Sequence, residues 1–158
     1  MMMTGEQYEE SLRKLNLVIY MFGERVQNPV DNPIIRPSMN AVKKTYELAH
    51  RPEHEDLMTA TSHLTGEKIN RFTHIHQSVS DLVKKTKMGR LLGAHTGCCF
   101  QRCVGMDSLN ALSIVTHDID QAHGAEYEKR FLEYLKYVQA NDFTCDGAMT
   151  DPKGDRSL

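Results

Sequence analysis

The chain has 158 residues, of which 40% are hydrophobic and 25% are charged, and its formal net charge is −2. This length allows one domain with a real core, and the small net charge excludes a general attraction to nucleic acid or to an anionic membrane. No apolar run approaches the length needed to cross a bilayer, and the first residues, MMMTGEQYEESLRKLN, lack the apolar core of a signal peptide. We therefore expect a cytoplasmic protein. In that reducing compartment cysteines are more often metal-binding or catalytic than bridged.

The first 26 residues predict one helix followed by a short hairpin. Thr4 and Gln7 have the three-residue spacing of a capping box, and apolar residues follow them at helical intervals. The run LVIYMFGERV, residues 17–26, is rich in β-branched and aromatic residues around Gly23. This composition favours a short β-hairpin near residues 17–26.

The next part predicts an extended connection that leads into a second helix. Pro29, Pro33 and Pro37 favour extended backbone. Pro37 or Ser38 can begin a helix that stops before Pro52. Its apolar face consists of Val42, Tyr46 and Ala49. Residues 51–75 show no dominant period and are interrupted by Gly66, so their structure stays open.

The half of the chain from Ser78 onward predicts a helical bundle. Ser78 and Asp81 can cap a helix, whose apolar residues are Val79, Leu82, Val83, Leu91 and Leu92. A second helical pattern extends from about residue 96 to residue 122 and ends at Gly124. Because its apolar residues face several directions, we expect that helix to be central and buried. The last helix, about residues 126–140, carries one apolar stripe, formed by Tyr127, Phe131, Tyr134, Leu135 and Val138. The predicted fold class is therefore mainly α.

Three of the four cysteines lie in GCCFQRCVGMD, residues 97–107, inside the pattern of the long helix. On a helix Cys99 and Cys103 share one face with Cβ atoms about 5–6 Å apart, whereas a disulfide needs about 3.8 Å. Cys98 points about 100° away around the same helix. Spacing alone favours inert core thiols, because free cysteine is among the most buried residue types, although Gln101 and Arg102 do not belong in a dry core. Two thiolates so placed also suit two corners of a cubane iron–sulfur cluster, and zinc is disfavoured because no second cysteine pair exists.

Several segments together resemble one flavoprotein family. They are CCFQRCVGMD, YMFGERV, IRPSMNAVKKTYELA, KMGRLLG, EYLKYVQAND and DGAMTDPKGDRSL. Together they resemble the N-terminal part of the 4-hydroxyphenylacetate 3-hydroxylase flavoprotein family. CFQRC followed by DPKGDR is similar to its dehydratase branch, whereas the monooxygenase branch is not expected to carry the cysteine pair. The resemblance covers essentially the whole chain but only the first segment of a longer family chain, so we expect a part of a longer protein.

This resemblance implies an architecture and a set of cofactors. The family fold is like that of the acyl-CoA dehydrogenases, so residues 1–145 would form an N-terminal helical domain. Residues 146–158 would begin a flavin-binding segment that leads into an absent middle β domain. The implied cofactors are FAD and one [4Fe-4S] cluster, for which Cys99 and Cys103 look like two of three cysteine ligands, with the third and a histidine in later sequence. The implied FAD-binding residues are Met149, Thr150, Asp151, Lys153, Gly154, Asp155 and Arg156, although turn chemistry alone favours a solvated charged turn there.

The resemblance also implies an activity, the loss of water from 4-hydroxybutyryl-CoA to give crotonyl-CoA, with isomerisation of vinylacetyl-CoA. The thioester does not acidify the C3 hydrogen of this substrate, so acid–base catalysis alone is inadequate and the unusual cofactor pair is explained. Gln101 resembles an active-site residue that can hydrogen-bond substrate. The implied partners are an acyl-CoA substrate, the missing C-terminal domains and further copies of the chain in a homo-oligomer, with neither nucleic acid nor membrane.

Two alternatives stay open: a flavin-dependent monooxygenase of the same family, which contains no cluster, and a non-catalytic helical fragment. The 158-residue chain alone is expected to be inactive, because half of the cluster ligands are missing from it. His74 and His76 are expected to be a plain histidine pair. The basic run from Lys84 to Arg90 is expected to be a solvated helix face rather than a phosphate site.

Overall fold

The computed structural model describes residues 2–97, 99–147 and 154–155, and within them the protein is mainly α, as predicted. The helices are α1 (Gly5–Arg13), α2 (Arg36–Ala49), α3 (Glu55–Met58), α4 (Val79–Thr96), α5 (Cys103–His123) and α6 (Tyr127–Asn141), with 3-10 turns η1 (Pro52–His54) and η2 (Arg71–Thr73). Two antiparallel hairpins pair β1 (Ile19–Met21) with β2 (Glu24–Val26) and β3 (Thr59–Thr61) with β4 (Lys68–Asn70). In this described part, no helix combines the length and apolarity that crossing a membrane requires.

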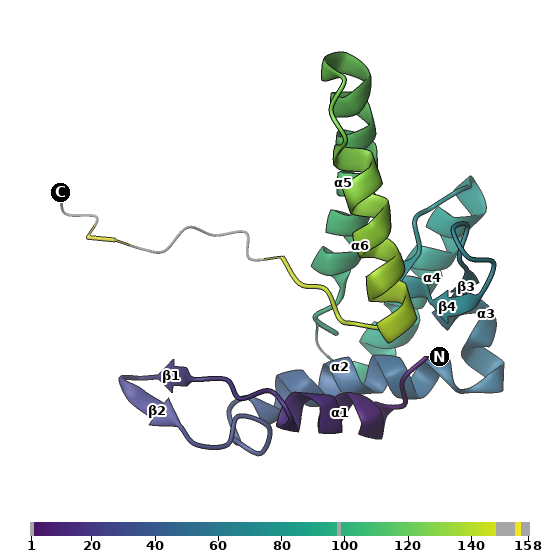
Figure 1. Ribbon diagram of the computed structural model, residues 1–158. Coiled ribbons are helices and arrows are strands. Elements are labelled where there is room, and N and C mark those ends of the chain that lie inside the picture. The colour runs from purple at the N-terminus through teal and green to yellow at the C-terminus, as the bar shows by residue number, and fades with distance from the viewer. Residues whose placement is uncertain (1, 98, 148–153, 156–158) are drawn as a thin grey trace.

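The helices form two groups at an angle to each other (Figure 1). Helices α1 and α2 lie side by side at the base, with the β1–β2 hairpin extending beyond them. Helices α5 and α6 pack against each other as an arm that projects away from this base, and α3, α4 and the β3–β4 hairpin flank the lower part of the arm.

The predicted helix starts are confirmed at atomic level. The backbone N–H of Gln7 donates to Thr4 Oγ1 (3.2 Å), and the backbone N–H of Thr4 donates to Gln7 Oε1 (2.8 Å), which is a complete capping box. Ser78 Oγ accepts the N–H of Asp81 at the start of α4. Both interactions satisfy N–H groups that a helix terminus leaves without intrahelical partners.

The predicted hairpin at residues 17–26 is also confirmed. Tyr20 pairs with Arg25, and the two-residue turn consists of Phe22 and Gly23, whose φ angles are +54° and +83°. Positive φ at both central positions is the geometry that matches the twist of a two-residue hairpin. The open region 51–75 contains the second hairpin, in which Gly66 has a φ of +74°.

Tyr46 is the centre of the packing between α1 and α2. It is fully buried, and its ring stacks on that of Tyr8 with centroids 4.8 Å apart. Burial raises the pKa of Tyr8 to about 12. The predicted face of α2 is confirmed, because Val42, Tyr46 and Ala49 are all buried.

The prediction of one long buried helix from residue 96 to residue 122 is wrong in two respects. First, α4 runs on to Thr96 and ends at Gly97, whose φ is +63°, and α5 begins only at Cys103. Second, the buried residues of α5 lie near its start, and the apolar side chains farther along, Leu112, Ile114 and Val115, are largely exposed. Apolar residues on several sides of a helix are found both in a helix that its own chain surrounds and in a helix that projects from the rest of the chain. The pattern therefore did not reveal that α5 projects.

The apolar stripes of α4 and α6 are buried only in part. On α6 the side chains of Phe131, Leu135 and Val138 are buried, but those of Tyr127 and Tyr134 are half exposed. On α4 the buried residues are Met88 and Leu92, whereas Val79, Leu82 and Val83 face outward. The expectation that the whole stripe, including Tyr127 and Tyr134, packs in the core is therefore wrong, because half of each of these two side chains is exposed.

Candidate functional site

The connection between α4 and α5, residues 97–103, carries the cysteines, and we call it the cysteine turn. Gly97 leaves α4 in the left-handed region, and Gln101 also has a positive φ of +59°. A left-handed residue other than glycine costs about 1–2 kcal/mol and persists only where the surroundings hold it. Cys103 is the first residue of α5. Cys98 lies outside the described residues.

Cys99 and Cys103 converge at this turn although they do not share a helix. Cys99 is exposed and Cys103 is half-buried, and their thiols lie close enough to influence each other electrostatically. The backbone N–H of Gln101 also points at Cys99 Sγ, 3.4 Å away. Burial raises the pKa of the Cys103 thiol above its usual value, and the adjacent Cys99 thiol raises it further. The backbone N–H groups at the start of α5 have the opposite, smaller effect. The predicted common helix face is wrong, because Cys99 precedes α5 and Cys103 is its first residue.

This thiol pair fits half of an iron–sulfur site. Two adjacent cysteine sulfurs, one of them exposed, match the thiolate ligands of a cubane. Among the residues that the structure describes, no group of three or more His, Cys, Asp or Glu side chains could hold a metal ion. Cys145 is placed elsewhere, because it packs against the apolar cluster around Leu109.

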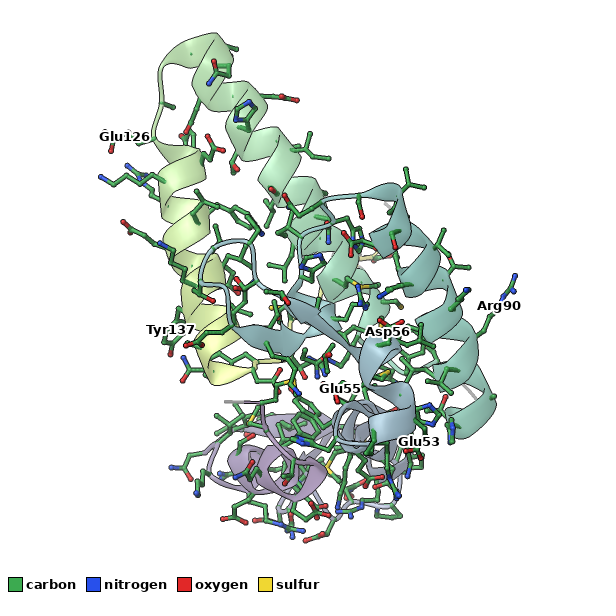
Figure 2. The ribbon with its side chains drawn as sticks, turned by 90° about the vertical axis from the view of Figure 1, so that its right-hand side faces the viewer. Glu53, Glu55, Asp56, Arg90, Glu126 and Tyr137 are labelled. Atoms are coloured by element: carbon green, nitrogen blue, oxygen red, sulfur yellow. The ribbon has the colours of Figure 1, made fainter. Side chains whose placement is uncertain are left out.

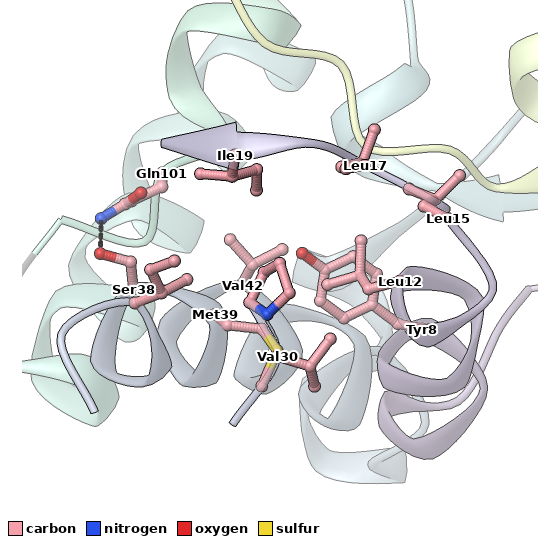
Figure 3. Close-up of a pocket in the computed structure, with 12 residues that line it drawn as sticks. Tyr8, Leu12, Leu15, Leu17, Ile19, Val30, Ser38, Met39, Val42 and Gln101 are labelled. Carbon is pink, nitrogen blue, oxygen red and sulfur yellow. Dashed lines mark hydrogen bonds between the residues drawn. The ribbon is translucent and has the colours of Figure 1, made fainter. Parts of the chain in front are cut away.

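Gln101 lies at one end of an apolar cavity (Figure 3). The cavity has a volume of about 240 Å³ and lies between α1, α2 and the strand β1. The Gln101 carboxamide donates from Nε2 to Ser38 Oγ (2.9 Å), and this polar pair lies at the edge of the aliphatic wall. The wall is formed by Tyr8, Leu12, Leu15, Leu17, Ile19, Pro29, Val30, Ile35, Met39 and Val42. The predicted catalytic residue therefore lies between the cysteine pair and an apolar space.

Arg102 behaves differently from what its sequence position suggests. Its side chain is only 1% exposed, and its guanidinium lies 4.4 Å from the ring centroids of both Tyr46 and Phe72. Its Nη1 also donates to Thr45 Oγ1 at 3.0 Å. The expectation that an arginine here would stay out of the core is wrong. No local signal could have revealed this, because its partners lie 30 residues or more away in the sequence.

Most of the predicted flavin-binding residues cannot be located in this structure. Met149, Thr150, Asp151, Lys153 and Arg156 lie outside the described residues. Gly154 and Asp155 are described, and both are exposed outside any helix or strand. Their assignment to FAD stays a prediction.

His74 belongs to the packing at the start of α4. It is buried, and its Nε2 lies 3.4 Å from Asp81 Oδ1. Burial lowers the pKa of His74 against the effect of that carboxylate. Asp81 also accepts the N–H of Gln77 and the guanidinium of Arg71. His74 is therefore part of a structural network at the helix start, in agreement with the plain histidine pair that was predicted.

The basic run on α4 lies on the outer surface. Lys84 forms an ion pair with Asp56, and Lys85 forms one with Asp107. Figure 2 shows Arg90 pointing away from the body of the protein. The predicted solvated face is confirmed for Lys87 and Arg90, which are exposed.

Comparison with known proteins agrees with this architecture. The family model described as 4-hydroxyphenylacetate 3-hydroxylase N terminal matches residues 4–158. The chain is 62% identical over its whole length to a 4-hydroxybutyryl-CoA dehydratase/vinylacetyl-CoA-Δ-isomerase from Clostridium aminobutyricum, of which it covers 32%. The structure matches all of its residues to 31% of an oxygen-tolerant archaeal 4-hydroxybutyryl-CoA dehydratase from N. maritimus, with a TM-score of 0.92 and 55% identity.

A more distant likeness concerns the fold alone. The oxygenase component of 4-hydroxyphenylacetate 3-monooxygenase, solved with FAD and 4-hydroxyphenylacetate, matches 99% of this chain with a TM-score of 0.73 and 22% identity, and 32% of that chain is covered. The chain thus spans about a third of the length of these relatives. Its helical fold corresponds to the N-terminal domain of an acyl-CoA dehydrogenase-like architecture. On the match over residues 4–158, the chain belongs to the 4-hydroxyphenylacetate 3-hydroxylase family, as part of its N-terminal region.

Proposed function

We propose that this chain is the N-terminal domain of a 4-hydroxybutyryl-CoA dehydratase that also isomerises vinylacetyl-CoA and depends on FAD and a [4Fe-4S] cluster. The observation that carries the proposal is the convergence of the Cys99 and Cys103 thiols at one turn beside Gln101. The 62% identity to the clostridial dehydratase supports this branch of the family over the monooxygenases. The protein would act in the cytoplasm, where the thiols stay reduced.

The domain boundaries follow from the same proposal. Residues 1–145 would form the helical domain, and residues 146–158 would begin the flavin-binding segment. The FAD in the distantly related oxygenase component supports flavin as the family cofactor. The exposed apolar side chains along α5, including Ile114, would meet the rest of a full-length chain or another subunit of a homo-oligomer, because soluble proteins rarely leave such patches uncovered.

Each site residue has a separate task in this proposal. Cys99 and Cys103, as thiolates, would bind two irons of the cluster, whose other ligands lie outside the chain described here. When bound, the cluster supplies a Lewis-acidic iron for the departing hydroxyl group and the flavin supplies one-electron chemistry. The Gln101 carboxamide, positioned by Ser38, would hydrogen-bond the acyl-CoA substrate, and the aliphatic wall beside it would exclude water.

The proposal is tested with the full-length protein, purified without oxygen. We expect FAD, about four irons and four sulfides per chain, and conversion of 4-hydroxybutyryl-CoA to crotonyl-CoA. Cys99→Ser and Cys103→Ser should each lose iron and dehydratase activity, whereas Cys145→Ser, which removes a thiol packed against the cluster around Leu109, should keep both. An iron-free, sulfide-free protein that hydroxylates a phenol with reduced flavin would instead establish the monooxygenase alternative.

A further inference from the structure

We infer that Arg102 is the positioning residue of the cysteine turn: it fixes the separation of the Cys99 and Cys103 sulfurs by anchoring the backbone between them in the core. The catalytic consequence of this inference rests on the proposed function. The geometric claim does not, because it concerns only the distance between two thiols of this chain.

The anchor is the stacking of the guanidinium between two aromatic rings. Tyr46 and Phe72 each lie with their centroids 4.4 Å from the guanidinium carbon, and they come from α2 and η2. A planar guanidinium stacks on aromatic faces in a way that an ammonium group does not. The hydrogen bond from Nη1 to Thr45 Oγ1 fixes its rotation in the plane between the rings. Arg102 is therefore tied to two elements distant from the turn.

The anchored backbone controls both thiols. Arg102 directly precedes Cys103, and its carbonyl accepts the N–H of Met106 in the first turn of α5. It occupies the N-cap position of α5 without making a side-chain cap, since its side chain enters the core instead. On the other side, Gln101 stays in the left-handed region, and its N–H reaches Cys99 Sγ. A shift of Arg102 would therefore move Cys103 directly and Cys99 through Gln101.

The chemistry of the buried arginine favours positioning over stability alone. Among the described residues, Nε and Nη2 of Arg102 have no hydrogen-bond acceptor, although both atoms are buried. Asp142 supplies an electrostatic partner, because the charge of Arg102 lowers the pKa of Asp142 against the larger effect of burial. A buried charge compensated in this way contributes less stability than an apolar residue of similar volume, whereas polar core groups can fix one arrangement of the chain. The one arrangement fixed here is that of the turn that carries the two thiols.

The test measures thiol proximity without any cofactor. Phenylarsine oxide bonds two nearby thiols at once and releases one water, so its affinity reports whether the pair is preorganised. The measurements use the 158-residue chain carrying Cys98→Ser and Cys145→Ser, which leaves the pair as the only thiols. Arg102→Lys and Arg102→Met are compared with Arg71→Lys. Arg71 is also a buried arginine, but it binds the carbonyls of Leu57, Asp56 and Thr59 instead of the cysteine turn.

We expect both Arg102 variants to bind the arsenical about tenfold more weakly than the parent. The affinity of Arg71→Lys should stay within about twofold of the parent. All three variants should lose thermal stability, so a loss of affinity confined to Arg102 is not a general effect of destabilisation. Arg102 variants that stay helical and bind the arsenical as tightly as the parent would overturn the inference. If they do not fold, Thr45→Val is decisive, because it removes the bond to Arg102 Nη1 together with a bond inside α2 from Thr45 Oγ1 to the Val42 carbonyl. A loss of arsenical affinity of about threefold or more supports the inference, and unchanged affinity refutes it. Iron content and dehydratase activity of the full-length Arg102→Lys protein are then measured separately, so failure of the proposed function leaves the geometric result intact.

Discussion

Gly105 in the first turn of α5 lies directly beneath the carbonyl oxygen of Cys145, which would be 1.9 Å from a Cβ atom placed on that glycine. The segment after α6 can therefore cross α5 beside Cys103 only while residue 105 has no side chain. Because the obstructing atom belongs to the backbone, no rotamer change relieves the clash. We predict that Gly105→Ala lowers the free energy of unfolding by about 2–4 kcal/mol or displaces the segment.

The matched control for this substitution is Gly93→Ala in α4. A Cβ atom at Gly93 would meet no heavy atom within 4 Å among the described residues. Replacing glycine by alanine inside a helix gains up to about 1 kcal/mol. Urea unfolding followed by circular dichroism should therefore give changes of opposite sign. Equal effects of the two substitutions would contradict the close crossing at Gly105.

Asp142 makes the stability depend on pH in an unusual direction. Burial raises its pKa from the ordinary 3.8 to about 6, although Arg102 and the Met3 N–H oppose the rise. The folded state then binds a proton more tightly than the unfolded state between about pH 4 and pH 6, so this group makes stability fall as pH rises through that window. The loss is complete above pH 6 and is at most about 3 kcal/mol.

Asp142→Asn imitates the protonated form and should remove this dependence. Asparagine accepts the left-handed backbone at this position, where φ is +49°. We expect the variant to be more stable than the wild type by about 1–2 kcal/mol at pH 7 and to differ little from it at pH 4. Unfolding curves of both proteins at several pH values give the difference directly, and the contributions of other carboxylates, such as Glu9, cancel. A constant difference across the range would show that folding does not shift the pKa of Asp142.

Gln139 joins α6 to the β3–β4 region through two buried hydrogen bonds. Its Oε1 accepts from Ser62 Oγ at 2.7 Å, and its Nε2 donates to the Thr73 carbonyl at 2.8 Å. Gln139→Met keeps the side-chain volume but removes the hydrogen-bond partner of the Ser62 hydroxyl and of the Thr73 carbonyl. We therefore expect the free energy of unfolding to fall by about 1–3 kcal/mol. Gln121→Met on the exposed side of α5 should change it by less than about 0.5 kcal/mol. Similar losses for the two variants would argue against the buried pair of bonds.

The turn of the first hairpin contains a residue whose replacement should increase stability. Phe22 has a positive φ of +54° and is 86% exposed, so its ring contributes little while its backbone is strained. Asn-Gly is the preferred pair for such a turn. Phe22→Asn should therefore raise the free energy of unfolding by about 0.5–1 kcal/mol, which thermal unfolding would show as a slightly higher melting temperature. The control is Tyr20→Asn in the adjacent strand, which should lower it.

The sequence predicted those features that depend on neighbouring residues. The capping box of Thr4 and Gln7, the hairpin around Gly23 and the end of α5 at Gly124 all follow from local backbone chemistry. The break between α4 and α5 was placed too early, because the second helix was predicted to begin at about residue 96 instead of at Cys103. The residues after Gly97 keep helical spacing and contain no proline. What holds that break open is the side chain of Arg102 among rings from distant segments, and no local pattern contains such a contact.

The sequence predicted Cys99 and Cys103 on one helix face, but Cys99 precedes α5 and lies in the turn. Four positions along a helix would bring the sulfurs to one face, and the turn brings them together by a different path. The identity of the remaining ligands could not be derived, since the described residues offer no third donor beside the pair. Side-chain exposure on the α5–α6 arm was also beyond prediction, because it depends on how far the arm projects from the other helices.

The cysteine turn connects the end of one long helix to the beginning of the next. On a continuous helix the gap between the two sulfurs would be set by the rigid backbone ladder, but here only Cys103 belongs to a helix, as the first residue of α5. A tilt of the α5–α6 arm would consequently move the Cys103 sulfur relative to the Cys99 sulfur. Any contact that changes the angle of the arm would therefore also change the geometry of the thiol pair.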